Sequence, residues 1–132
     1  FKGLETAEQG LCSWCDRFVM DQWGTGRFIT GQPGPEDISA ARRGYLTCRD
    51  VLRSGYFDLV VLDEILLCVS YQMVSVDEIS DLIVSRAPGV EVIMTGRSAP
   101  RELVMLADLV TDMKKVKHYY DRGVHARKGI EF

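Results

Sequence analysis

A short apolar run that ends in two adjacent acids constrains this chain more than any other feature. The run extends from Phe57 to Leu62, and Asp63 and Glu64 follow it directly. Buried parallel strands have this composition, and open α/β sheets bind ligands at the carboxyl edge, where such acids lie. The run therefore predicts a strand that delivers carboxylates to a ligand site. The alternative is a polar strand end that leads into a helix, because acids are favoured at helix N-termini in any case.

The rest of the sequence alternates predicted helices with predicted strands. Helices are expected from Pro35 to Ser54, from the two acids to about Tyr71, after a Ser75–Glu78 capping box and after Pro100. Further strands are expected at residues 18–23, 90–95 and 109–113. This order predicts a single domain over residues 1–132, an α/β fold with a mostly parallel, doubly wound sheet.

Helical spacing also predicts which side chains face the core. The helix after Pro35 is expected to bury Ile38, Ala41, Tyr45, Cys48 and Leu52. The helix after Pro100 is expected to turn Leu103, Leu106 and Ala107 inward.

Composition limits the possible partners and the compartment. The net charge of −3 argues against nucleic acid as the main partner. No apolar stretch approaches the roughly 20 residues of a membrane span, so no membrane partner is expected. Cys12 and Cys15 could be half of a zinc site or a redox pair, but neither Cys48 nor Cys68 completes a set with metal spacing. We favour two small apolar residues on a helix, and the cysteine usage fits a reducing, cytoplasmic setting.

A second group of polar residues follows the predicted strand at 90–95. Arg97 comes after that strand and a glycine, so it is expected at the same carboxyl edge as the acids. A guanidinium there suits a polyphosphate, since its planar fork binds phosphate oxygens two at a time. The alternative is a salt bridge to Asp63 or Glu102.

Four blocks in the second half carry a specific resemblance. They read TGRSAP at 95–100, ADLVT at 107–111, VKH at 116–118 and KGIEF at 128–132. Together with the acidic strand end they resemble the P-loop type of ATP:corrinoid adenosyltransferase, also called cob(I)alamin adenosyltransferase. The similarity runs from about Phe1 to the last residue. It implies a RecA-like P-loop NTPase fold, ATP and a reduced corrinoid as substrates, Mg²⁺, a reductase or flavodoxin that supplies electrons, and a homodimer.

The resemblance also implies roles for individual residues. Glu64 would bind Mg²⁺ with support from Asp63, as the acids of a Walker B strand do, and Thr95 and Arg97 would contact the nucleotide. The loop at 24–34 matches a family loop near the corrinoid, often G-x-G-F-T-W, although residues 27–29 here read Arg-Phe-Ile. Arg27, Phe28 and Tyr71 are the corrinoid-binding candidates. The alternatives are a surface loop with one anchoring Phe, and a Tyr71 that belongs to the core.

One part of the family pattern is absent from the printed sequence. No segment matches the phosphate loop G-x-x-x-x-G-K-[ST], so the first βα unit of the fold is missing from the 132 residues. We therefore expect this chain alone to be inactive, with apolar surface exposed at Val60 and Leu62. The rival interpretation is a non-catalytic relic of the fold that binds a corrinoid or a partner without turnover.

Overall fold

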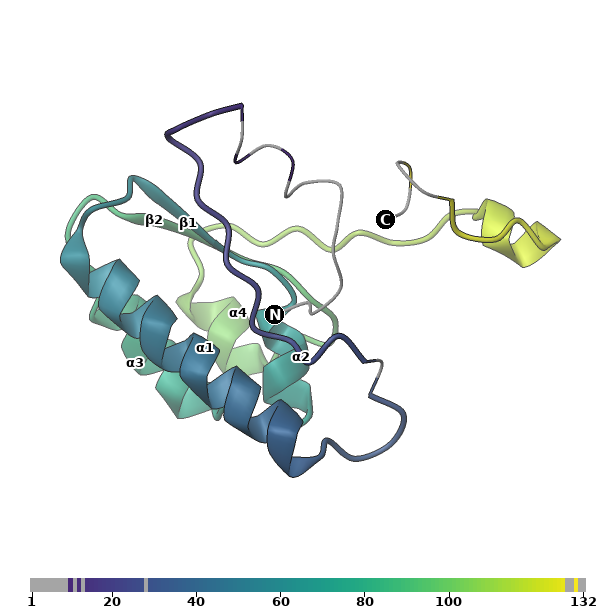
Figure 1. Cartoon of the computed structure of the whole chain (residues 1–132), viewed down its shortest axis with the longest axis horizontal. Helices are drawn as coiled ribbons and strands as arrows, with labels where there is room; N and C mark the ends of the chain where they lie inside the picture. Colours follow the sequence, from purple (N-terminus) through teal and green to yellow (C-terminus); the bar gives the residue numbers. More distant parts are fainter. Residues whose placement is uncertain (1–9, 11, 13, 28, 128–129, 131–132) are drawn as a thin grey trace. The chain divides into compact units, whose positions relative to one another are not determined.

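The computed structural model describes residues 10, 12, 14–27, 29–127 and 130. Its elements in chain order are helix α1 (Pro35–Ser54), strand β1 (Leu59–Leu62), helices α2 (Ile65–Ser70) and α3 (Val76–Val84), strand β2 (Glu91–Met94), helix α4 (Arg101–Leu106) and a short 3₁₀ helix, η2 (Tyr119–Arg122) (Figure 1). From Pro35 to Leu106 the helices and strands follow the order that the sequence predicts.

The chain divides into two compact units. One comprises residues 22–108 and contains both strands and helices α1 to α4. The other contains the described residues from 10 to 21 and from 109 to 130. A single domain over the whole chain stays a prediction.

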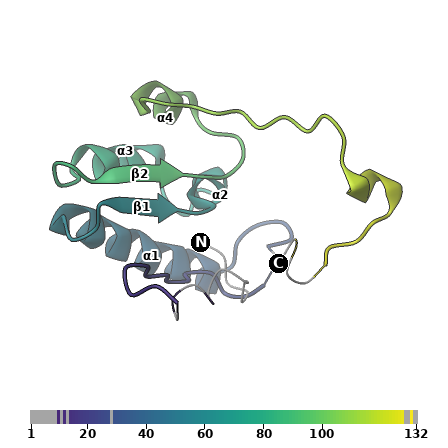
Figure 2. The same ribbon diagram turned by 90° about the horizontal axis from the view of Figure 1, so that it is seen from above.

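The two strands form a parallel sheet in register. Leu59 of β1 lies opposite Glu91 of β2, and Leu62 lies opposite Met94. The four helices α1 to α4 lie on one side of this sheet, as the two perpendicular views show (Figures 1 and 2). The mixed α/β class and the parallel pairing are therefore confirmed, whereas a doubly wound sheet stays a prediction.

The two faces of the sheet differ in burial because side chains of a strand alternate between faces. Leu62 is 3% exposed and Val60 packs against the core, so both belong to the face that the helices cover. On the opposite face Leu59 is 51% exposed and Val61 is 52% exposed. The expectation that Val60 and Leu62 would be exposed is wrong, and the neighbouring positions carry that exposure instead.

Helix α1 begins and ends with clear local signals. Pro35 occupies the first turn together with Glu36 and Asp37, and Gly55 ends the helix with a φ of 65°, which glycine adopts without steric cost. Most of the predicted stripe is buried or half-buried. Ile38 is the exception at 42% exposed, because it lies near the helix start, beyond the edge of the core.

Five side chains at the centre of the first unit are almost completely removed from solvent. Burial of one such aliphatic side chain stabilises the fold by about 2 kcal/mol. They come from α1, α2, α3 and the turn between α2 and α3: Leu52, Ile65, Val74, Ile79 and Leu82. Helix α3 is fixed at its start by the predicted capping box, in which Ser75 and Glu78 each accept a backbone N–H of the other. This core holds the helices under the strand ends.

Three predictions about the remaining segments are wrong. Residues 18–23 and 109–113 form no strand, and Met113 is 92% exposed. Within the described part of the chain only β1 and β2 pair, so neither segment has an adjacent strand to take its backbone hydrogen bonds. In the six-residue helix α4 only Leu103 is buried, and Leu106 and Ala107 are exposed.

The four cysteines differ in accessibility. Cys12 and Cys15 are exposed thiols, which does not agree with the expectation of small apolar residues packed along a helix. No cluster of three or more metal-ligating side chains occurs among the described residues. Cys68 is buried, and this burial raises the pKa of its thiol to about 11. Cys48 is half-buried, so Cys12 and Cys15 are the most accessible of the four thiols.

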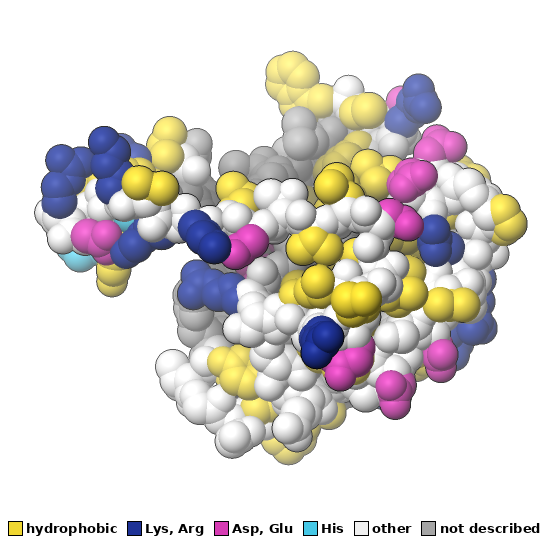
Figure 3. All heavy atoms as spheres, turned by 180° about the vertical axis from the view of Figure 1, so that it is seen from behind, with side chains coloured by type: hydrophobic (Ala, Val, Ile, Leu, Met, Phe, Trp, Pro, Cys, Tyr) yellow, Lys and Arg dark blue, Asp and Glu magenta, His cyan; other side chains and the backbone are white. Residues whose placement is uncertain are grey.

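The second unit carries a basic segment. Lys114, Lys115, Lys117 and Arg122 are exposed, and Lys and Arg side chains gather on this part of the chain (Figure 3). Two of the cations pair locally, Lys115 with Asp121 at 2.9 Å and Lys114 with Asp112 at 3.5 Å. Across the residues that the structure describes, no helix is long and apolar enough to cross a membrane.

Candidate functional site

The strand ends bring four of the predicted site residues to one edge. Because β1 and β2 are parallel and in register, Asp63 and Glu64 leave the sheet beside Thr95 and Arg97. The Thr95 hydroxyl donates to Asp63 Oδ1 at 2.7 Å and accepts from the Glu64 amide at 2.9 Å. One hydroxyl therefore connects the residue after β2 to both acids after β1.

Backbone contacts hold the same edge. The Thr95 amide donates to the Leu62 carbonyl at 3.2 Å, and the Leu66 amide donates to the Thr95 carbonyl at 3.3 Å. Gly96 then passes over the start of α2 with a φ of 141°, and a Cβ built there would lie 2.7 Å from Leu66 Cβ. This position accepts only glycine without movement of the backbone.

Glu64 has an unusual conformation at the start of α2. Its φ is 58° and its ψ is 21°, the left-handed region that non-glycine residues adopt at a cost. Its backbone amide donates a hydrogen bond to the Thr95 hydroxyl. Among the residues with described positions, none donates a hydrogen bond to the half-buried Glu64 carboxylate. The two acids thus differ: Asp63 is hydrogen-bonded to Thr95, whereas the carboxylate of Glu64 has no such partner.

Arg97 lies at the same edge and is exposed. It forms no ion pair with Asp63 or Glu102, the alternative that the sequence left open, and has no other ion-pair partner within the described portion of the chain. A guanidinium with its donors directed to solvent is available for an anionic group such as a phosphate. Glu64 and Arg97 therefore bring a carboxylate and a guanidinium to this edge. Neither group has a hydrogen-bond or ion-pair partner among the described residues.

The chemistry of this edge fits Mg²⁺. Magnesium takes oxygen ligands and is usually held by one or two carboxylates, with substrate phosphates and water completing the octahedron. Glu64 would offer a carboxylate that has no hydrogen-bond donor among the described residues, and Asp63 a second one that Thr95 orients.

The second group of candidates lies around the 24–34 loop. Arg27 forms an ion pair with Glu36 in the first turn of α1. The Tyr71 hydroxyl donates to the Ile29 carbonyl at 3.5 Å, and the Ile29 side chain packs against the core. Phe28, the third corrinoid-binding candidate, lies outside the described residues. The structure thus places Tyr71 beside this loop, and Tyr71 also packs against the core, as the alternative expects.

Both ends of the loop are tied to one carboxylate. Asp37 Oδ1 accepts from the Thr25 hydroxyl at 2.6 Å, and Oδ2 accepts from the Gly34 amide at 3.0 Å. The Thr25 hydrogen bond, the Gly34 amide and the charge of Arg27 lower the pKa of the Asp37 carboxyl, against a smaller opposing effect of burial. Asp37 is therefore charged in the folded chain over a wider acidic range than an ordinary aspartate.

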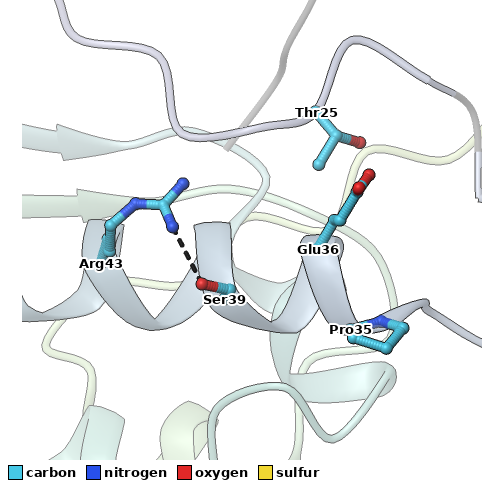
Figure 4. Close-up of a pocket in the computed structure, with 5 residues that line it drawn as sticks. All are labelled: Thr25, Pro35, Glu36, Ser39 and Arg43. Carbon is cyan, nitrogen blue, oxygen red and sulfur yellow. Dashed lines mark hydrogen bonds between the residues drawn. The ribbon is translucent and has the colours of Figure 1, made fainter.

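An open cavity of about 440 Å³ lies beside these contacts. It is lined by Thr25 from the loop and by Pro35, Glu36, Ser39 and Arg43 from α1 (Figure 4). Arg43 is turned toward Ser39 and donates to its hydroxyl at 2.9 Å. The cavity is open to solvent, so it marks the junction of loop and helix rather than an enclosed binding site.

Helix α2 connects the two groups of candidates. Glu64 is its N-cap and Tyr71 is its C-cap. Seven residues of helical rise separate them by about 10 Å. The backbone positions of Glu64 and Tyr71 therefore lie at opposite ends of one short, largely buried helix, which fixes the spacing between these two positions.

Sequence reasoning missed Thr25 and Asp37. From the sequence, the positive end of the helix alone is enough to explain the acids in the first turn of α1. The available signal was a Gly-Pro start followed by an acid at the third helical position, since such an acid accepts the N-cap amide. Nothing in the sequence indicated that the same carboxylate also holds Thr25, which lies twelve residues earlier.

The fold and the strand-end acids define an α/β domain whose polar groups meet at the carboxyl edge of parallel strands. All 132 residues match the family described as ATP:corrinoid adenosyltransferase BtuR/CobO/CobP, and the chain belongs to this family.

Curated relatives agree with this family. A corrinoid adenosyltransferase of Sinorhizobium is 31% identical over 97% of the chain and 59% of its own length. One of Escherichia coli K12 is 33% identical over 82% of the chain and 55% of its own length. The corrinoid adenosyltransferase CobA of Salmonella typhimurium is 37% identical over 73% of the chain and 49% of its own length. The chain thus spans about half to three fifths of the length of these relatives.

Proposed function

We propose that this chain takes part in transfer of the 5′-deoxyadenosyl group of ATP to the cobalt of a reduced corrinoid. Co(I) supplies an electron pair to C5′ of ATP, the C5′–O bond breaks, and triphosphate leaves with the bonding electrons. The protein needs no nucleophilic side chain for this step, because the metal of the substrate is the nucleophile. The site is required to position both substrates and to neutralise the leaving group.

The observation that supports the proposal is the arrangement at the strand ends. Glu64 has a carboxylate and Arg97 a guanidinium without a described protein partner, and both lie at the edge where such sheets bind ligands. Mg²⁺ bound through Glu64 would neutralise charge on the triphosphate. Arg97 would bind phosphate oxygens, and Thr95 would hold Asp63 in place through its hydroxyl.

The loop and Tyr71 would contact the corrinoid. The hydrogen bond between the Tyr71 hydroxyl and the Ile29 carbonyl places them together. In this proposal the surface excludes the lower ligand of the cobalt so that Co(II) can be reduced by a reductase or flavodoxin. A cytoplasmic location and a homodimer also stay predictions.

The phosphate loop forms part of the same proposal. Successive backbone amides, a lysine and a helix N-terminus bind the phosphates in P-loop sites. The printed sequence contains no such motif. We propose that residues 1–132 alone do not transfer the adenosyl group, and that activity requires this motif in the same protein.

Glu64→Gln, made in the natural full-length protein, tests the assignment. We expect adenosyl transfer to fall about a hundredfold, or ~2.7 kcal/mol in the barrier, because a metal carboxylate is lost. The matched control is Glu91→Gln. It is the same change at an exposed residue, the first of β2, at the end of the sheet away from Glu64. Turnover close to normal at saturating Mg²⁺ would refute the role of Glu64. Corrinoid binding by the unaltered protein without transfer would support the non-catalytic relic instead.

A further inference from the structure

The 24–34 loop has little support from regular structure. Its described residues belong to no helix or strand, and two of its glycines, Gly26 and Gly31, have positive φ angles of 77° and 97°. Its contacts with the rest of the first unit are mainly made by side chains. The position of such a loop therefore depends on a few hydrogen bonds rather than on a backbone ladder.

Asp37 uses both carboxylate oxygens on this loop. Oδ1 accepts from the Thr25 hydroxyl near the start of the loop, and Oδ2 accepts from the Gly34 amide at its end. One side chain on a 20-residue helix thus closes the loop. Hydrogen bonds to an ionised carboxylate are stronger than those between neutral groups, so this closure is well suited to hold a short segment.

The closure also determines where the loop faces. Arg27 lies two residues after Thr25 and pairs with Glu36, the neighbour of Asp37. Ile29 packs on the core, and its carbonyl accepts from the Tyr71 hydroxyl. If the loop ends were released, Arg27 and the Ile29 backbone would lose their fixed relation to Tyr71.

We propose that Asp37 is a positioning residue for corrinoid binding, which fastens both ends of the 24–34 loop to α1 so that Arg27 and Tyr71 form one surface. This inference rests on the proposed function, since it concerns the corrinoid part of that site. It assigns no chemical step to Asp37 and predicts an effect on one substrate only.

The test compares Asp37→Ala with Glu78→Ala in the natural full-length protein. Glu78 is a matched control because it occupies the third position of α3, as Asp37 does in α1. Its carboxylate accepts a hydrogen bond from the amide of the N-cap residue Ser75 and one further hydrogen bond, from Arg42. Both variants lose a helix-start hydrogen bond and a side-chain partner. Only Asp37→Ala releases the loop.

We expect Asp37→Ala to raise the KM for cob(I)alamin about tenfold, as for loss of a hydrogen bond to a charged group, with the KM for ATP within about twofold. Hydrogen exchange of the amides at 29–34 should become about tenfold faster. Asp37→Asn should restore most of both, because its amide can still accept from Gly34 and donate to Thr25. Glu78→Ala should change neither quantity.

Equal KM values for cob(I)alamin in the two alanine variants would overturn the proposal, as would a parallel rise in the KM for ATP. Unchanged exchange at 29–34 in Asp37→Ala would also overturn it, whatever the enzyme assay shows. If the unaltered protein binds no cob(I)alamin, the proposed function fails and the corrinoid role of Asp37 fails with it. The exchange measurement then still decides whether Asp37 holds the loop.

Discussion

The strand ends and the 24–34 loop contribute to the candidate site in different ways. At the strand ends, Thr95 is placed by sheet hydrogen bonds and by its contacts to the start of α2. In the loop, placement depends on the side chains of Thr25, Asp37 and Tyr71. The first region is built into the backbone, and a single side-chain loss should leave it in place. The second region can change with one substitution and leave the core intact.

The largest expected effect breaks the strand-end region through its backbone. Gly96→Ala should destabilise the fold by about 3 kcal/mol, because the new Cβ meets Leu66 and the φ of 141° suits only glycine. Gly89→Ala is the control, since that φ is 86° with open space around the Cβ, and should cost about 1 kcal/mol. Urea unfolding measures both. An equal loss of unfolding free energy in the two variants would mean that the contact with Leu66 does not add to the cost of Gly96→Ala.

A smaller effect is expected from the hydroxyl between the strands. Thr95→Val removes the donor to Asp63 and the acceptor of the Glu64 amide, and should cost about 1–2 kcal/mol. Thr95→Ser keeps the hydroxyl and should retain most of the stability. Thermal unfolding of the two variants measures the difference. A valine variant as stable as the serine variant would show that this hydroxyl adds nothing.

The smallest expected effect is a loss of stability at acidic pH. Hydrogen bonds, chiefly from Thr25 in one case and the Ser75 amide in the other, lower the pKa of Asp37 and of Glu78 below their usual values of 3.8 and 4.5. The folded chain therefore binds fewer protons than the unfolded chain in this range, and stability falls as the pH falls through the lowered values.

Amide resonances report these titrations directly. The Gly34 amide should titrate with a midpoint below 3.8 and the Ser75 amide with a midpoint below 4.5, since each donates to the titrating carboxylate. The Leu66 amide donates to a backbone carbonyl at the strand ends and should not follow either midpoint. A pH series of two-dimensional NMR spectra measures all three. Midpoints above the usual values would contradict the direction of both shifts.

The sequence was most informative where local pattern and topology agree. The apolar run before Asp63 and the glycine after Thr95 each predicted a strand end, and parallel strands in register bring such ends together. The capping box at Ser75 and the Pro35 start were equally predictable, because helix starts have residue-specific hydrogen bonds. These local rules also located Glu64 and Arg97 at one edge.

The sequence was least informative where a residue depends on a distant partner. Apolar composition at 109–113 predicted a strand, but a strand also needs a neighbour for its backbone groups. Alternation alone could not tell which of Val60 and Val61 faces the helices. The bond between Thr25 and Asp37 joins a loop to a helix across twelve residues, and no periodicity records it.

At Glu64, the left-handed backbone makes the requirements of thermostability and of function conflict. A side chain held at a φ of 58° costs on the order of 1 kcal/mol that glycine would not incur. Gln72 and Ser98 have the same φ of 56°. Glycine at those two positions is a reasonable choice for anyone who wants a more heat-resistant chain. Selection for heat resistance alone would favour the same change at Glu64, and the carboxylate assigned to the metal would be lost with it.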